Sequence, residues 1–123
     1  MEYLTLQKIR AYVIAYELSN HVWTVISEWD SFAKWTIGKQ FAEAIDSISA
    51  NIAEGFGRYH KKEKIHHYRY SFGSLEESKD WASKAIQRGL LKGTAAEHIL
   101  SELNKLPIEI NYLIKYTNEK LKY

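Results

Sequence analysis

The chain has 123 residues, of which 46% are hydrophobic and 14% aromatic, which suits one domain spanning residues 1–123 and is too little for two. The absence of cysteine excludes disulfides and thiolate sites, and the lack of a signal-peptide pattern or a long apolar run predicts a cytoplasmic protein without a membrane span. The formal net charge is only +2, but segment 58–70 carries five basic residues against one acidic residue, so a local positive potential is expected.

Apolar residues recur at helical spacing along most of the chain, which predicts four helices. The first is expected over about 5–27. Its predicted apolar stripe consists of Leu6, Ile9, Val13, Tyr16, Val22, Trp23 and Ile26. The connector 28–35 contains Trp29, Phe32 and Trp35, so it is predicted to be a packed, partly helical elbow.

The second helix is expected over about 36–54, with Gly55 as its C-terminal stop. Its predicted core face is Ile37, Phe41, Ala44, Ile45, Ile48 and Ile52. Small residues on the flank of that face, Ala42, Ser49 and Ala53, favour close approach of a neighbouring backbone, so this helix is predicted to be central.

The third helix is expected over 61–88, and Gly89 and Gly93 bracket the turn after it. Its predicted core face is Ile65, Tyr68, Phe72, Leu75, Ala82 and Ile86. Thr94 and Glu97 have the spacing of a capping box, which predicts that the fourth helix begins there.

The fourth helix is expected to contain Pro107, which predicts a kink near 103–106 or a helix in two pieces. Its predicted inward stripe is Ile99, Leu103, Leu106, Ile110, Leu113 and Thr117. Four helices joined by short turns predict an all-α fold, an antiparallel up-down-up-down four-helix bundle.

A polar stripe lies beside the core face of the second helix. It consists of Gln40, Ser47, Asn51, Glu54 and Arg58. One interpretation is local bonding at the helix end, with Arg58 paired to Glu54 at i+4. The other is a polar groove for a ligand or a protein partner.

Two large aromatic residues of the third helix, Tyr70 and Trp81, project together away from its core face. Tyr112 and Tyr116 lie outside the main stripe of the fourth helix. Such residues predict a second buried surface, and hence a homo-oligomer with Tyr70 and Trp81 in the interface. The alternative is that they are scattered surface aromatics, which are common.

Candidate catalytic and metal residues are sparse. His60, Glu63 and His67 could share a helical face, but three nearby lysines oppose a cation and no fourth ligand is evident, so no metal site is predicted. The chain shows no catalytic triad, paired-acid motif or phosphate loop, and Gly55-Phe56-Gly57 follows a helix where a nucleotide fingerprint requires a strand. We therefore expect no enzyme and no cofactor.

The basic stretch RYHKKEKIHHYRY is the strongest functional candidate. Its cations, Arg58, Lys61, Lys62, Lys64 and Arg69, could contact phosphates, while Tyr59, Tyr68 and Tyr70 could stack on unpaired bases. The alternative is a solvated helix end, because the charges surround the helix start and form no single stripe. Tyr68 is also expected in the core.

Three segments carry a resemblance to a known family: Ala15–Trp23, Gly38–Arg58 with its Asn-Ile-Ala-Glu-Gly motif, and Phe72–Ser78. The chain resembles, over nearly its full length, the bacterial four-helix-bundle proteins named after open reading frames in intervening sequences of 23S ribosomal RNA genes. It departs from them after Arg58, where Tyr59-His60-Lys61-Lys62 replaces a serine-led helix start.

This resemblance implies an up-down bundle that commonly forms a ring-like homopentamer, with no established enzymatic activity. A similar bundle, the accessory variability determinant of diversity-generating retroelements, is thought to bind nucleic acid and a reverse transcriptase. By analogy, the partners implied are other copies of the chain, RNA or DNA, and a protein such as a reverse transcriptase.

The leading hypothesis from the sequence is a non-enzymatic, oligomeric nucleic-acid-binding protein that uses the basic stretch. The alternative is a protein-interaction scaffold whose partner binds Gln40, Asn51 and Glu54. A third and weaker hypothesis is a hydrolase that uses Glu54 or His67.

Overall fold

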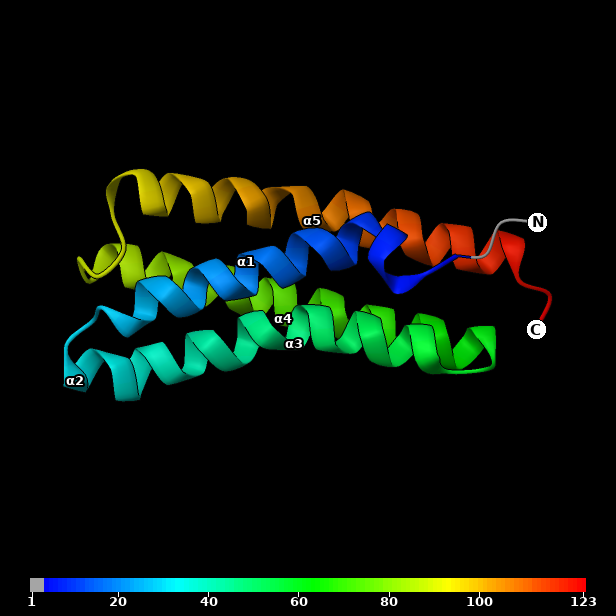
Figure 1. The fold of residues 1–123 in the computed structure, drawn as a ribbon, viewed down its shortest axis with the longest axis horizontal. Helices are drawn as coiled ribbons and strands as arrows, with labels where there is room; N and C mark the ends of the chain where they lie inside the picture. The colour runs from blue at the N-terminus through cyan, green and yellow to red at the C-terminus, as the bar shows by residue number, and fades with distance from the viewer. Residues whose placement is uncertain (1–3) are drawn as a thin grey trace.

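Four long helices make up most of the computed structural model, which describes residues 4–123. They are α1 (Arg10–Ser27), α3 (Lys39–Gly57), α4 (Lys61–Gln87) and α5 (Gly93–Lys120), and the short elements are η1 (Leu6–Lys8), α2 (Ser31–Ala33) and the π-helical turn η2 (Lys34–Gly38). Successive long helices run in opposite directions (Figure 1). The predicted all-α four-helix bundle is confirmed.

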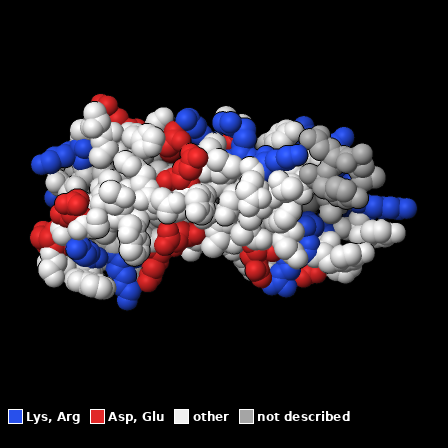
Figure 2. All heavy atoms as spheres, in the orientation of Figure 1, with Lys and Arg blue, Asp and Glu red and all other residues white. Residues whose placement is uncertain are grey.

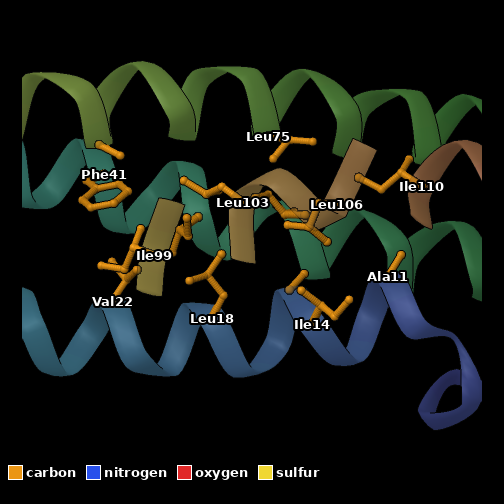
Figure 3. Packing of buried hydrophobic residues seen from close by; sticks show 14 of the residues in the cluster. Ala11, Ile14, Leu18, Val22, Phe41, Leu75, Ile99, Leu103, Leu106 and Ile110 are labelled. Atoms are coloured by element: carbon orange, nitrogen blue, oxygen red, sulfur yellow. The ribbon is translucent and has the colours of Figure 1, made fainter. Parts of the chain in front are cut away.

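Each long helix packs on two neighbours, so the four helices surround one core. α1 contacts α3 and α5, and α4 contacts the same two helices. Apolar side chains from all four point into the space between the helices (Figure 3). The core therefore runs along the length of the bundle.

The predicted core faces of α3 and α5 are confirmed, because every residue assigned to them is buried. The face predicted for α1 is partly wrong, since Tyr16 and Trp23 are exposed. The side chains that α1 buries are Ala11, Ile14, Ala15, Leu18, Ser19, Val22 and Ile26. The small residues among them let α1 approach its neighbours closely, which excludes the large rings from that face.

The face predicted for α4 is only partly buried. Tyr68, Leu75 and Ala82 are buried, whereas Ile65 and Phe72 are half-buried and Ile86 is exposed. The smaller residues Ser71, Ser78 and Ala85 fill the rest of the buried face, so α4 also approaches its neighbours closely.

Gly55 does not end the second long helix, contrary to the sequence prediction. α3 continues to Gly57, and the backbone becomes extended at Arg58. A Cβ atom on Gly55 would come within 2.7 Å of the Tyr68 ring and 2.9 Å of the Lys64 carbonyl oxygen. Gly55 is therefore the point where α3 and α4 touch, and its role is to make room for Tyr68.

Tyr68 and Ser71 join α4 to its neighbours. Tyr68 is buried, and burial raises the pKa of its phenol to about 12, although a hydrogen bond with Thr117 of α5 partly offsets that rise. The buried Ser71 Oγ donates to the Ile48 carbonyl oxygen of α3 at 2.8 Å. Because Tyr68 lies in the core, as expected, it cannot stack on a base.

Two more predicted helix ends differ from the observed ones. α1 begins at Arg10 and not near Thr5, because Ile9 is extended and buries its side chain. The capping box is wrong, since α5 begins at Gly93 after Lys92 and no side chain caps it. Gly93 lies in the left-handed region at φ 63°, and Gly89 at φ 73°, so these two glycines form the turn as predicted.

The elbow between α1 and α3 is partly helical, as predicted, but it is not fully packed. The Ala33 amide donates to Asp30 Oδ1 at 3.0 Å, which caps α2, and the turn η2 then joins α2 to α3. Trp29 packs against the core, whereas Phe32 and Trp35 are 79% and 71% exposed. The prediction that all three rings are packed is therefore wrong for two of them.

α5 passes through Pro107 as one helix. The alternative of two separate pieces is wrong. A kink near 103–106 stays a prediction.

Candidate nucleic-acid interface

The basic segment surrounds the turn from α3 to α4, at the end of the bundle opposite α2 (Figure 1). Arg58 follows the end of α3, Tyr59 is exposed, and His60 precedes the first residue of α4. Its cations lie toward the same end of the bundle, but they make different contacts there.

Lys61 ties the start of α4 to the end of α5. Its Nζ donates to the carbonyl oxygens of Asn118 at 3.0 Å and Leu121 at 3.1 Å, and its amide donates to the Tyr123 carbonyl oxygen. A cation at a helix C-terminus also interacts favourably with the helix dipole. Part of the bonding capacity of Lys61 is therefore used inside the molecule.

Lys64 has the corresponding role at the end of α3. Its Nζ donates to the Phe56 carbonyl oxygen at 2.7 Å and lies 5.4 Å from the centre of the Phe56 ring. Burial lowers the pKa of this ammonium group. Lys64 thus supports the fold, because its Nζ is already bonded to the end of α3.

Arg58 pairs with carboxylates on both sides of the turn. Its guanidinium lies 2.6 Å from Glu54, which confirms the predicted i,i+4 pair, and 3.7 Å from Glu63. All three side chains are about half exposed, and such pairs are worth at most about 1 kcal/mol. A phosphate could therefore compete with these carboxylates for Arg58.

Lys62 and Arg69 are exposed, and neither forms an ion pair within residues 4–123. A hollow of about 290 Å³ lies beside Lys62 and is lined by Arg58, Lys62, Glu63, His66 and His67. Nδ1 of His67 is buried and has no hydrogen-bond partner among the described residues. The hollow thus combines two cations and two imidazoles with one carboxylate.

The surface charge elsewhere is mixed. On the face where α1 crosses in front of α4, acidic and basic side chains are interspersed, with wide uncharged areas between them (Figure 2). No single sign of charge dominates this face.

The polar stripe of α3 is bonded within its own helix. Ser47 Oγ donates to the Glu43 carbonyl oxygen at 2.8 Å, Asn51 Nδ2 donates to the Ser47 carbonyl oxygen at 2.9 Å, and Glu54 pairs with Arg58. The pair of Glu54 with Arg58 is the predicted one, whereas Ser47 and Asn51 bond to carbonyl groups inside the helix and not at its end. Gln40 is exposed and lies apart from them, at the α2 end.

The two aromatic residues predicted at an oligomer interface have different surroundings. Tyr70 is 52% exposed, and its hydroxyl group lies 2.6 Å from His66 Nε2. Trp81 is half-buried against the core, and its Nε1 donates to Glu77 at 3.1 Å. The prediction that both rings face solvent is right for Tyr70 and only partly right for Trp81.

No three His, Asp or Glu side chains of the part that the structure describes come together in a way that could hold a metal ion. This applies to His60, Glu63 and His67. His66 and His67 instead pack edge-on against Tyr70, with ring centres 4.4 Å and 5.7 Å from it.

A family model described as 23S rRNA-intervening sequence protein matches residues 7–112. The chain belongs to this family. A search of the curated proteins gives no match. In this 23S rRNA-intervening sequence protein, no helix between residues 4 and 123 has the length and apolar character needed to cross a bilayer.

A pair of histidines between α1 and α5 was not predicted from the sequence. The rings of His21 and His98 meet edge to face with centres 4.8 Å apart, and His21 Nε2 is buried without a partner among the described residues. Burial lowers the pKa of His21 below 6.5, and the nearby charge of His98 lowers it further. The predicted fold places the first and last helices side by side, but it does not determine which residues of the two helices lie opposite each other. The contact between His21 and His98 therefore could not be predicted.

The lowered pKa of His21 predicts a loss of stability in acid. Between its folded pKa and 6.5 the unfolded chain binds more protons, so the contribution of His21 is complete above 6.5 and is lost as the pH falls through the folded pKa. The urea midpoint of the wild type should drop between pH 7.5 and pH 5.5, and His21→Gln should drop less. The exposed His60→Gln is the control and should behave as the wild type; an equal drop in His21→Gln would contradict the prediction.

Proposed function

We propose that this protein is a non-enzymatic nucleic-acid-binding bundle whose contact surface is the basic segment at the start of α4. The observation that carries the proposal is the hollow in which Arg58, Lys62, His66 and His67 surround a single carboxylate, Glu63. Cationic and imidazole groups at one opening suit a phosphate, and exposed Lys or Arg side chains supply most of the affinity for a nucleic-acid backbone. The family description names an intervening sequence of 23S rRNA, which makes RNA the first ligand to test.

We assign different roles to the cations of the segment. Lys62 and Arg69 are exposed and form no ion pair with any described carboxylate, so we assign them the main phosphate contacts. Arg58 joins them when a phosphate displaces Glu54 or Glu63. Lys61 and Lys64 hold the ends of α5 and α3 and add to the potential without leaving those bonds.

Binding of labelled RNA and DNA, followed by fluorescence anisotropy at several salt concentrations, tests this assignment. Lys62→Ala and Arg69→Ala should each weaken binding for all sequences and reduce the slope of log K against log salt by about 1. Lys105→Ala removes an exposed charge from the middle of α5, where Lys105 pairs with Glu102, and is the control for loss of a charge outside the segment; it should leave the slope unchanged. Absence of binding at low salt, or unchanged slopes in both variants, would contradict the proposal and favour the scaffold hypothesis.

We also propose that copies of this chain assemble through the exposed apolar side chains of α4 and α5, starting from Tyr70. The support is that Tyr70, Tyr112 and Ile108 are each more than half exposed. Trp81 is a weaker candidate for this contact, because part of its ring already packs against the core. The ring-like pentamer remains an expectation from the family resemblance.

Light scattering coupled to size-exclusion chromatography measures the mass in solution. Assembly predicts a multiple of 14.4 kDa that falls when Tyr70 is changed to Ser. A single-copy mass for the wild type would refute assembly without affecting the nucleic-acid proposal.

A further inference from the structure

The elbow and the basic segment lie at opposite ends of the bundle (Figure 1). A second hollow lies at the elbow. It has a volume of about 560 Å³ and lies between the elbow and the last turns of α4. The residues that line it are Phe32, Trp35, Thr36, Ile37, Lys39, Gln40, Trp81, Lys84 and Arg88. None of these belongs to the segment that the sequence singled out for phosphate binding.

The elbow holds two aromatic rings in solvent on one side of this hollow. Phe32 belongs to α2 and Trp35 to the π-helical turn η2, and both are more than two-thirds exposed. π-Helical turns are rare and are frequent at functional sites. On the opposite side Trp81 is held in place by the bond from its Nε1 to Glu77, and Lys84 lies 4.7 Å from the centre of its ring. The hollow thus has aromatic rings on both sides, of which Phe32 and Trp35 are exposed and Trp81 is partly covered by Lys84 and the core.

The charges that line the hollow are all positive among the described residues: Lys39, Lys84 and Arg88 contribute, and no Asp or Glu does. Lys84 is neutralised by Asp80, which lies 2.7 Å away and outside the lining. Lys39 and Arg88 are exposed and form no ion pair in residues 4–123. Two cations are therefore available at the same opening as two exposed rings.

From this juxtaposition we infer that the hollow binds single-stranded nucleic acid. Unpaired bases stack on Phe32 and Trp35, and the phosphates between them contact Lys39 and Arg88. Stacked rings beside a cationic groove are the usual means of binding single strands without sequence preference, because every base has a flat face. A duplex buries those faces and cannot use the rings. This site adds to the proposed function and does not rest on it, since it shares no residue with the basic segment.

A second copy of the chain is the other occupant to consider for the exposed rings. The lining charges disfavour it, because a copy would have to bury Lys39 and Arg88 against a surface with matching carboxylates, and burial of an unpaired charge is costly. A phosphate backbone supplies that negative charge directly. The solution mass and the nucleic-acid binding are therefore measured on the same samples.

Fluorescence anisotropy with labelled dodecamers of dT and of U, and with a blunt DNA duplex, tests the inference. The double variant F32A/W35A should bind both single strands about tenfold more weakly or worse, because each stacked base is worth about 1–3 kcal/mol. Its weak binding of duplex should stay unchanged. Trp35→Tyr keeps a stacking face and should retain most of the wild-type affinity. Tyr16→Ala, which removes an exposed ring of α1 outside this hollow, is the control. Comparison of dT with U separates DNA from RNA.

Two further results discriminate between the sites. Lys39→Ala and Arg88→Ala should each lower the salt slope of single-strand binding, and the variant K62A/R69A should retain the aromatic-dependent part of that binding. Single-strand affinity unchanged in F32A/W35A would overturn the inference. A lower solution mass of F32A/W35A at unchanged single-strand affinity would also overturn it, because the rings would then form a contact between copies of the chain. Both rings are exposed, so the variant is expected to fold, and its circular dichroism should match that of the wild type.

Discussion

Gly55→Ala should lower the free energy of unfolding by about 2 kcal/mol, although alanine is the better helix former by roughly 1 kcal/mol. The added Cβ would lie 2.7 Å from the Tyr68 ring and 2.9 Å from the Lys64 carbonyl oxygen. Tyr68 is buried and the carbonyl belongs to the backbone, so neither can yield without moving α4 away from α3. Urea unfolding followed by circular dichroism measures the change.

Two other glycines provide matched controls for this variant. A Cβ on Gly57, at the end of α3, or on Gly73, inside α4, would meet no atom within 4 Å. Gly73→Ala should therefore stabilise the bundle by up to about 1 kcal/mol through helix propensity alone, and Gly57→Ala should change little. If Gly55→Ala were as stable as Gly73→Ala, close contact between α3 and α4 would not explain the glycine.

Phe41→Ala should cost about 3–5 kcal/mol, the largest effect expected from a single truncation in this bundle. Phe41 is fully buried, and its ring points from α3 into the space between the helices (Figure 3). Truncation removes its transfer free energy and leaves a cavity that the surrounding helices can close only in part. A 123-residue domain has a total stability of about 5–15 kcal/mol, so the variant should be close to unfolding at room temperature.

Phe32→Ala is the control for Phe41→Ala, because Phe32 is also a phenylalanine but is 79% exposed. It should change the free energy of unfolding by less than about 0.5 kcal/mol. Phe41→Leu keeps most of the volume and should lose less than Phe41→Ala, so a graded series remains measurable if the alanine variant is unfolded. Equal losses for Phe32→Ala and Phe41→Ala would contradict the placement of α3 in the bundle.

Helix faces that bury large side chains could be predicted from the sequence, and those that bury small ones could not. The stripes of α3 and α5 consist mainly of Ile, Leu and Phe, whose burial dominates the free energy and sets the orientation of the helix. On α1 the same reasoning placed Tyr16 and Trp23 inside, but close packing favours Ala11 and Ala15 at the contact. Periodicity identifies the helix; the distance to its neighbours decides which side of a broad stripe is buried.

The positive charge of the basic segment follows from the sequence, but the partners of most of its cations could not be predicted. The local bond between Arg58 and Glu54 follows from their spacing along one helix. The partners of Lys61 are carbonyl groups near the end of α5, which the fold alone brings close. The elbow likewise could be recognised by its aromatic residues, whereas the exposure of Phe32 and Trp35 depends on the turn η2.

The turn η2 has a consequence for how related chains can vary. A π-helical turn bonds residue i to i+5 instead of i+4, so it accommodates one more residue than the α-helical turn that could replace it. Loss of one residue between Lys34 and Gly38 would therefore let a regular α-helical turn replace η2, without the rotation of about 100° that a one-residue deletion causes inside a regular α-helix. Phe32 and Phe41 would both keep their faces, so the elbow is a place where a related chain can be one residue shorter and leave the interior of the bundle intact.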